Sequence, residues 1–189
     1  FAKSAPSRDT PNLQCHIQPI STDKLAGANL HDFHAFTPTV ANIRPTSRGE
    51  ITINSSDSKV NPKIKMNYLS TDEDRKVAAD GIKLIRKIVM ETNEFKKYEP
   101  EEFRPGSHLN EKEEIVKACS HYAQTIFHPV GTCKMGNDES AVVSDKLKVH
   151  GLNKLRVVDA SIMPNITSGN TNAPTIMIAE KGADMILSS

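Results

Sequence analysis

The chain has 189 residues, 25% of them charged and 37% hydrophobic, and its 24 Lys and Arg against 23 Asp and Glu leave a formal net charge of +1. This length suits one domain, or two small ones, with a real hydrophobic core. The near balance of charge excludes a global field that would draw the protein to nucleic acid, an anionic membrane surface or an acidic substrate.

Cysteine usage and apolar runs bear on the compartment. Cys15, Cys119 and Cys133 are odd in number and contain no CxxC pair, which is typical of free thiols in a reducing compartment. No apolar run reaches the roughly 20 residues that span a bilayer, and the N-terminus does not resemble a signal peptide. We expect a soluble, cytoplasmic protein, with peripheral membrane association left open. The start at Phe1 rather than methionine suggests a processed product, a separate subunit or an excerpt of a longer polypeptide.

The N-terminal part of the chain predicts β-strands, because apolar and polar residues alternate there. Three segments show this pattern, residues 12–20, 50–54 and 63–68, and a fourth strand is expected over 34–43, which is rich in Phe, Thr and Val. Pro19 is expected at the end or the edge of the first. Polar loops are expected around Gly27 and over 57–62, and the turn at 44–49 predicts a hairpin-like connection between the second and third strands.

The next part predicts helices. Residues 70–73, Ser-Thr-Asp-Glu, have the form of a capping box, and a helix is expected over 72–92. Its apolar stripe comprises Val77, Gly81, Ile85, Ile88 and Val89. A second helix is expected from Glu111 to about Ala123, because its acidic first turn suits the helix dipole. The stripe of this helix should pack on a sheet, and it comprises Ile115, Ala118, Cys119 and Tyr122.

The C-terminal part predicts one strand-loop-helix unit. Residues 155–159 suggest a short buried strand, and Asn172 can cap a last helix with Pro174 in its first turn. The apolar face expected of this helix comprises Ile176, Ala179, Ala183 and Ile186. Strands followed by helices predict an α+β fold, mostly antiparallel sheet with flanking helices, whose closing unit belongs to a different domain.

Residues 127–136 form a polar loop with two glycines and a proline, and this loop can present His128 to a cleft. An imidazole, with an unperturbed pKa of about 6.5, suits a general base at physiological pH. A structural role for a histidine beside proline in a turn is the alternative. His128 and Cys133 could also be read as zinc ligands, but no second pair with metal-ligand spacing accompanies them, so no metal site is predicted.

Residues 157–181 place an acidic side chain at the end of the expected strand, followed by a polar loop and a helix N-terminus. Folds with α/β units commonly bind ligands at such a point, and the free N–H groups and dipole of the helix start favour negative charge. The alternative is that Asn170 and Asn172 only turn the chain and cap the helix.

Two long stretches, HPVGTCKMG from His128 and AVVSDKLKVHGLNKLRVVDASIMPNITSGNTNAPTIMIAEKGADMI from Ala141, resemble the C-terminal segment of the glucose-methanol-choline (GMC) oxidoreductases, most closely the choline dehydrogenase and bacterial alcohol dehydrogenase branch. Weaker similarity, through SRGEITINS and NYLSTDEDRKVAADGIKLIRKI, extends back to about Thr37. Residues 1–36 match only loosely. Ser144 departs from the family's usual Asp-Pro turn, which affects only the detail of that loop.

The resemblance implies a flavin-dependent alcohol oxidoreductase. His128 would accept the hydroxyl proton of a primary alcohol while hydride passes to FAD, and Asn170 would hydrogen-bond the substrate oxygen. Because an amide cannot titrate near neutrality, His128 would carry the acid–base role alone. The implied FAD contacts are Asp159, Ala160, Asn172 and Pro174. Residues 1–141 would belong to the substrate domain, and residues 142–189 would return to complete the FAD domain.

An FAD site of this kind also needs a G-x-G-x-x-G turn, and the nine glycines contain no G-x-G. We therefore expect the main FAD motif on a missing N-terminal portion, and the chain alone to bind FAD poorly and to be inactive. The alternatives are a free-standing binding or structural module, or a lyase that uses flavin only structurally. The sequence names neither the alcohol nor the electron acceptor, quinone or oxygen, and leaves a homo-oligomer open.

Overall fold

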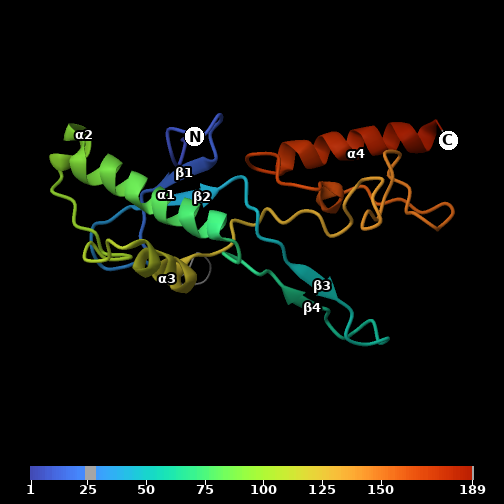
Figure 1. Ribbon diagram of the computed structural model, residues 1–189, viewed down its shortest axis with the longest axis horizontal. Coiled ribbons are helices and arrows are strands. Elements are labelled where there is room, and N and C mark those ends of the chain that lie inside the picture. Colours follow the sequence, from blue (N-terminus) through green and yellow to red (C-terminus); the bar gives the residue numbers. More distant parts are fainter. Residues whose placement is uncertain (24–28, 189) are drawn as a thin grey trace. The chain divides into compact units, whose positions relative to one another are not determined.

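Short antiparallel strand pairs come first and helices follow, as Figure 1 shows for the computed structural model, which describes residues 1–23 and 29–188. The loop expected around Gly27 lies outside the described residues. The elements confirm the α+β class: β1 Leu13–Gln18, β2 Thr37–Asn42, β3 Glu50–Thr52, β4 Lys63–Lys65, α1 Asp72–Glu91, α2 Asn93–Lys96, α3 Lys112–Tyr122, the 3₁₀ turn η1 Ala160–Ile162 and α4 Asn172–Leu187.

The chain divides into two units. Unit 1 comprises Phe1–Asn42 and Thr71–Gln124, and unit 2 comprises Ile43–Ser70 and Thr125–Ser189. Both units are therefore built from two separate stretches of sequence. The assignment of 1–141 and 142–189 to a substrate and an FAD domain concerns a different division, and it stays a prediction.

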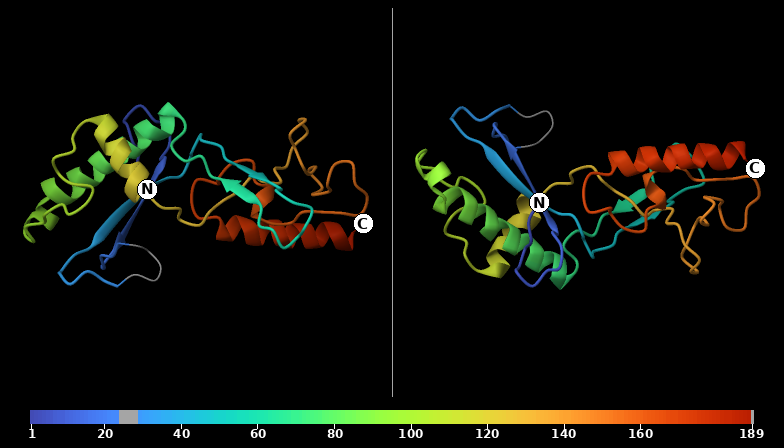
Figure 2. Two further views of the ribbon diagram at one scale, coloured as in Figure 1. Left: turned by 90° about the horizontal axis from the view of Figure 1, so that it is seen from below. Right: turned by 90° about the horizontal axis from the view of Figure 1, so that it is seen from above.

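In unit 1, β1 pairs antiparallel with β2, so that Leu13 lies opposite Asn42 and Gln18 opposite Thr37. Helix α1 packs on β2 and α3 packs against α1, side by side with it in Figures 1 and 2. The buried side chains of this core include Leu13, Val77 and Ile115. The expected packing of the second helix on a sheet is thus wrong, because α1 occupies the space between them.

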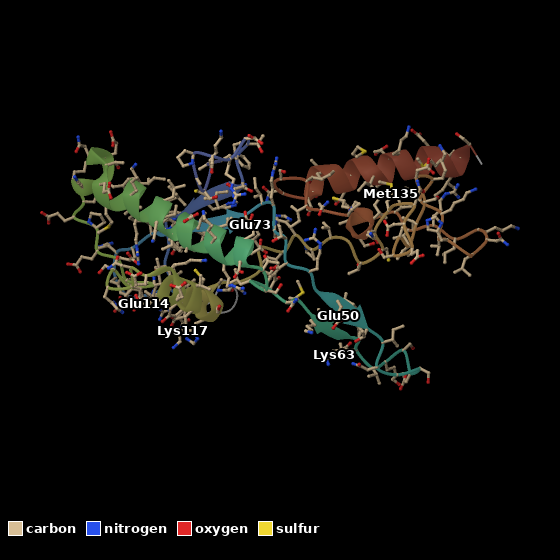
Figure 3. The ribbon with its side chains drawn as sticks, viewed as in Figure 1. Glu50, Lys63, Glu73, Glu114, Lys117 and Met135 are labelled. Atoms are coloured by element: carbon tan, nitrogen blue, oxygen red, sulfur yellow. The ribbon has the colours of Figure 1, made fainter. Side chains whose placement is uncertain are left out.

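The start of α1 differs from the expected capping box by one residue. Thr71 is the N-cap, and its hydroxyl accepts the backbone N–H of Asp74 at 3.2 Å. Ser70 instead donates its backbone N–H to Ser47 Oγ at 3.0 Å, and it belongs to unit 2. The S-x-x-E pattern therefore placed the N-cap one residue too early, at Ser70 instead of Thr71. In α3 a capping box is present, between Glu111 and Glu114, and Glu114 is marked in Figure 3.

Arg86 of α1 anchors the long connection between α2 and α3. Its guanidinium donates to both carboxylate oxygens of Glu102, at 2.8 and 2.9 Å, and to the carbonyls of Gly106 and Leu109, at 2.9 and 2.7 Å. The Arg86 and Glu102 side chains are only 17% and 11% exposed. One side chain of α1 thereby holds three points of an otherwise irregular segment.

In unit 2, β3 pairs antiparallel with β4, with Ile51 opposite Ile64. Glu50 and Lys63 mark the two strands in Figure 3. The hairpin expected between the second and third strands is wrong, since β2 pairs with β1 and β3 with β4. Gly49 contributes to this choice: a Cβ there would lie 2.3 Å from the carbonyl oxygen of Lys65, so only glycine lets the backbone before β3 approach β4 so closely.

The core of unit 2 forms where α4 packs against η1 and the loops before it. Its buried side chains are Val143, Leu147, Ile162, Met163 and Ile178. Residues 155–159 do not form the expected strand: Arg156 makes an isolated bridge with Lys148, and Leu155 is 48% exposed. Apart from that bridge, this stretch pairs with none of the described strands, and its Val157 and Val158 pack against the core.

The buried side of α4 also differs from the expected one. Ile178 and Gly182 are buried, whereas Ile176 and Ile186 of the expected face are 55% and 52% exposed. Apolar residues occupy almost every side of this helix, so the spacing of apolar residues did not identify one buried face. Among the described residues, no helix has the length and apolar character needed to cross a membrane.

Replacing Gly182 by alanine should lower the free energy of unfolding by about 1–2 kcal/mol, because a Cβ there would lie 2.4 Å from Cγ1 of Val158. Overpacking against a stiff β-branched side chain outweighs the roughly 0.5–1 kcal/mol that alanine gains in a helix. Urea denaturation measures the change. Lys181→Ala, next along the helix and exposed, is the control and should stay within about 0.5 kcal/mol. A stabilised Gly182→Ala variant would contradict the packing of α4 described above.

Candidate active site

Three side chains of unit 2 meet where the loop after α3 reaches the start of α4. Nδ1 of His128 lies 2.9 Å from the hydroxyl of Thr171, and Nε2 lies 2.9 Å from the amide nitrogen of Asn170. The backbone N–H of Thr171 also points at Nδ1, over a longer 3.4 Å. His128 is half-buried, Thr171 buried and Asn170 exposed, so the ring is held on its Nδ1 side and open on the side of Asn170.

The loop that carries His128 is tied to η1 by its backbone. Cys133 and Met135 donate their N–H groups to the carbonyls of Ser161 and Ile162, at 3.0 and 2.8 Å. Figure 3 marks Met135 in this loop. Gly131, with φ +89°, makes the left-handed turn that glycine adopts without strain. These contacts fix the backbone on the C-terminal side of His128.

A second loop, residues 163–170, carries Asn170, and two arginines hold it. Arg48 Nη2 donates to Asn165 Oδ1 at 2.5 Å, and Arg44 Nε donates to Ser168 Oγ at 3.0 Å. No local sequence pattern marks either arginine, because both lie over 100 residues from their partners. Thr171 was not expected in the site either, and the only sequence signal for it is its place between Asn170 and Asn172 in the Gly-Asn-Thr-Asn segment.

The residues implied in FAD binding lie on two elements of unit 2. Asp159 is exposed and caps η1, since its Oδ1 accepts the N–H and the hydroxyl of Ser161 at 2.8 and 2.5 Å. Ala160 begins η1. Asn172 and Pro174 lie in the first turn of α4, with Asn172 exposed. The first N–H groups of a helix have no intrahelical acceptor, so the start of α4 offers free donors and the positive end of a dipole.

The hydroxyl of Ser140 and the ammonium of Lys134 hydrogen-bond Asp138 and hold the pKa of its carboxyl far below the usual range. In unit 1, burial raises the pKa of the Cys119 thiol. Within the part of the chain that the structure describes, no group of three or more His, Cys, Asp or Glu residues could hold a metal ion.

Comparison with known proteins gives consistent matches. The family model of the C-terminal part of GMC oxidoreductases matches residues 45–179. An "Alcohol dehydrogenase [acceptor]" of Pseudomonas putida is 45% identical over 99% of this chain and 34% of its own length, and an "Oxygen-dependent choline dehydrogenase" of Pseudomonas fluorescens (strain SBW25) is 44% identical over 98% of this chain and 32% of its own. This chain thus spans about a third of the length of these relatives.

Solved structures agree with the sequence matches. A formate oxidase of Aspergillus oryzae RIB40, determined to examine the effect of a mutation on FAD modification, has a TM-score of 0.80 with this chain at 30% identity, over 95% of this chain and 32% of the oxidase. The family indicated by the sequence motifs is thereby confirmed. With a family model covering most of its length and a matching fold, the chain belongs to the GMC oxidoreductase family.

Proposed function

We propose that this chain is the C-terminal, substrate-domain portion of an FAD-dependent alcohol oxidoreductase. The observation that supports this most directly is the 2.9 Å contact between His128 and Asn170. In this contact an imidazole nitrogen lies next to a side-chain amide, so that both groups can hydrogen-bond one substrate oxygen. A packing-only remnant of the family would have no need of this pair.

In the proposed reaction, the O–H bond of a primary alcohol breaks and its proton passes to Nε2 of His128. The carbinol C–H bond also breaks, its hydride leaves with the bonding electron pair, and the alcohol becomes an aldehyde. Bound FAD would supply the two-electron acceptor for this hydride. A terminal electron acceptor, quinone or oxygen, completes the cycle.

Asn170 orients the substrate in this proposal. Its amide N–H donates to the alcohol oxygen and stabilises the negative charge that develops there as the proton leaves. Because the amide does not titrate, His128 is the only acid–base group of the pair. The hydrogen bond from Arg44 Nε to Ser168 Oγ, at 3.0 Å, stabilises the loop that carries Asn170.

The residues proposed to hold FAD fit the group chemically. The start of α4, where Asn172 and Pro174 lie, presents the backbone N–H groups of Asn172 and Ala173 and a positive dipole end. These suit the carbonyl-bearing pyrimidine ring of a flavin. Asp159 holds the N–H and hydroxyl of Ser161 and so shapes the backbone at Ala160 beside which the ribityl and phosphate groups are proposed to lie.

The apolar surface of α4 supports the proposal that residues 142–189 complete an FAD domain. Ile176, Met177, Ile186 and Leu187 are 55%, 59%, 52% and 85% exposed. Side chains of this kind on one short helix mark a contact surface more often than a free one. The further polypeptide is proposed to cover them and to supply the dinucleotide-binding motif.

The test is anaerobic reduction of bound flavin in the full-length polypeptide, with a panel of choline, an aliphatic primary alcohol and an aromatic primary alcohol. Loss of the oxidised flavin absorbance with at least one of them is expected, together with one aldehyde per flavin reduced. A tertiary alcohol, which has no carbinol hydrogen to transfer, serves as the control and should leave the spectrum unchanged. A flavin that stays oxidised with every alcohol, yet is reduced by dithionite, would exclude the oxidoreductase and favour a binding module or a structural flavin.

A further inference from the structure

The loop that carries Asn170 contains a residue in the left-handed region. Ser168 has φ +60°, a conformation that favours glycine and that a residue with a Cβ adopts only at a cost in free energy. Such a residue keeps its conformation only where its surroundings hold it there. Among the described residues, the structure gives 164–169 no backbone–backbone hydrogen bond. Side chains must therefore hold the turn that leads from Ser168 to Asn170.

The side chains that hold this turn come from residues 43–48, here called the strap, which is fixed at both ends. Ile43 is buried, at 4% exposure. At the other end the carbonyl of Arg48 accepts the side-chain N–H of Asn67 at 2.9 Å. Nη1 of Arg48 also donates to two carbonyls of the strap itself, both at 3.0 Å. The strap can thus serve as a support for the loop beside it.

The strap contacts the loop at two points. Nε of Arg44 donates to Oγ of Ser168 at 3.0 Å, across 124 positions of sequence, and Nη2 of Arg48 donates to Oδ1 of Asn165 at 2.5 Å. Hydrogen bonds from a charged guanidinium are stronger than those from neutral donors. The bond from Arg44 falls on the one residue of the loop whose φ is strained, two positions before Asn170.

We propose that Arg44 is a positioning residue, which holds Ser168 in the left-handed conformation and so keeps the Asn170 amide 2.9 Å from Nε2 of His128. Under the proposed function, on which this inference rests, the amide is then aimed at the alcohol oxygen before the substrate binds. Arg44 acts through the backbone of Ser168 and makes no contact with the alcohol. Its loss leaves the amide present but misplaced.

Two substitutions at Ser168 separate strain from simple contact. Alanine removes the oxygen that accepts from Arg44, and its Cβ still opposes the positive φ. Glycine removes the same oxygen but adopts a positive φ without strain. If Arg44 acts by holding the strained conformation, Ser168→Gly should keep more of the rate than Ser168→Ala. If the hydrogen bond only adds local stability, the two variants should be equally slow.

The experiment is kinetic and uses the full-length polypeptide. Arg44→Met should lower kcat and kcat/KM by the same factor, roughly 10-fold, within the ~100-fold that a misplacement of about 1 Å can cost. KM and flavin content should change little, because the lost interaction forms in the transition state. Arg44→Lys, which keeps a charged donor, should recover part of the rate.

Arg156→Met is the matched control. Arg156 also belongs to unit 2, but it donates to the carbonyls of Lys146 and Met185, both at 3.4 Å, and not to the loop that carries Asn170. Its kcat should stay near wild type. An equal loss of kcat in Arg156→Met and Arg44→Met would show a general effect of removing a guanidinium, and it would overturn the proposal.

A double-mutant cycle tests whether Arg44 acts through Ser168. Ser168→Ala should match Arg44→Met, and the double variant should be no slower than either, since both changes break one contact. Additive losses, or equal rates in Ser168→Gly and Ser168→Ala, would overturn the proposal. If Arg44→Met loses its fold or its flavin, the comparison of glycine with alanine at position 168 decides alone.

Asn170→Ala separates this proposal from the function on which it rests. A strong loss of kcat in Asn170→Ala, with wild-type kcat in Arg44→Met and Ser168→Ala, would overturn the positioning role and leave the proposed function in place. Wild-type kcat in Asn170→Ala would overturn the proposed role of Asn170, and the positioning role of Arg44 with it. A loss in all three, with the order of glycine and alanine given above, is the expected result.

Discussion

Replacing His128 by alanine in the full-length polypeptide is expected to lower kcat/KM for its alcohol by about 100- to 10,000-fold, the usual contribution of a positioned general base. Flavin content should change little, because the side chain contacts Thr171 and Asn170 and none of the residues proposed to hold FAD. Steady-state kinetics and the ratio of flavin to protein absorbance measure the two quantities on the same preparation.

His150→Ala is the matched control for this variant. His150 also belongs to unit 2 and hydrogen-bonds a backbone carbonyl, that of Gly136, at 3.1 Å, but it contacts neither Asn170 nor Thr171 through any bond that the structure gives. Its kinetics should stay near wild type. Parallel loss of flavin and turnover in His128→Ala would mean that His128 is a structural histidine of its turn, the alternative that its place beside Pro129 leaves open.

Replacing Arg86 by alanine is expected to lower the free energy of unfolding of the chain by about 2–4 kcal/mol. The change removes four hydrogen bonds and leaves the Glu102 carboxylate, only 11% exposed, without its cation. Loss of one partner of a largely buried, hydrogen-bonded pair costs far more than loss of a surface pair. The midpoint and slope of urea denaturation give the change.

Lys76→Ala in the same helix provides the comparison. Lys76 pairs with Asp80 at 2.8 Å, but its side chain is 51% exposed, and such a pair contributes about 0.5 kcal/mol or less. Glu102→Gln should lie between the two variants, since the amide still accepts one hydrogen bond. Equal effects for Arg86→Ala and Lys76→Ala would show that the segment between α2 and α3 is not held as the structure describes.

Local patterns predicted most of the helices well. The spacing of Val77, Gly81 and Val89 placed a helix over 72–92, and α1 runs over Asp72–Glu91. The acidic start at Glu111 likewise placed α3. Such patterns succeed because neighbours three and four residues apart share one face of a helix. Errors arose where several residues satisfy the same rule, as at Ser70 and Thr71, both of which are good N-caps.

Strand partners and buried faces were beyond the reach of local patterns. The Phe, Thr and Val content of residues 34–43 and the alternation at 50–54 predict two strands but not their neighbours. In the structure β2 pairs with β1 rather than with β3. In α4, apolar residues on nearly every side left the buried face to be set by Val158 and the core around Ile162. Pairing and burial depend on segments distant in sequence, whose meeting is a property of the whole chain.

The sequence by itself determined the family and named His128 and Asn170, because both lie in long motifs whose residues are contiguous. Only the tertiary structure decided that these two side chains lie 2.9 Å apart across 42 positions of sequence, and that Thr171 holds the other side of the ring. The reason is physical: a motif records which side chains are present, whereas a hydrogen bond depends on where Pro174, Gly131 and the two arginines of the β2–β3 connection place the backbone that carries them.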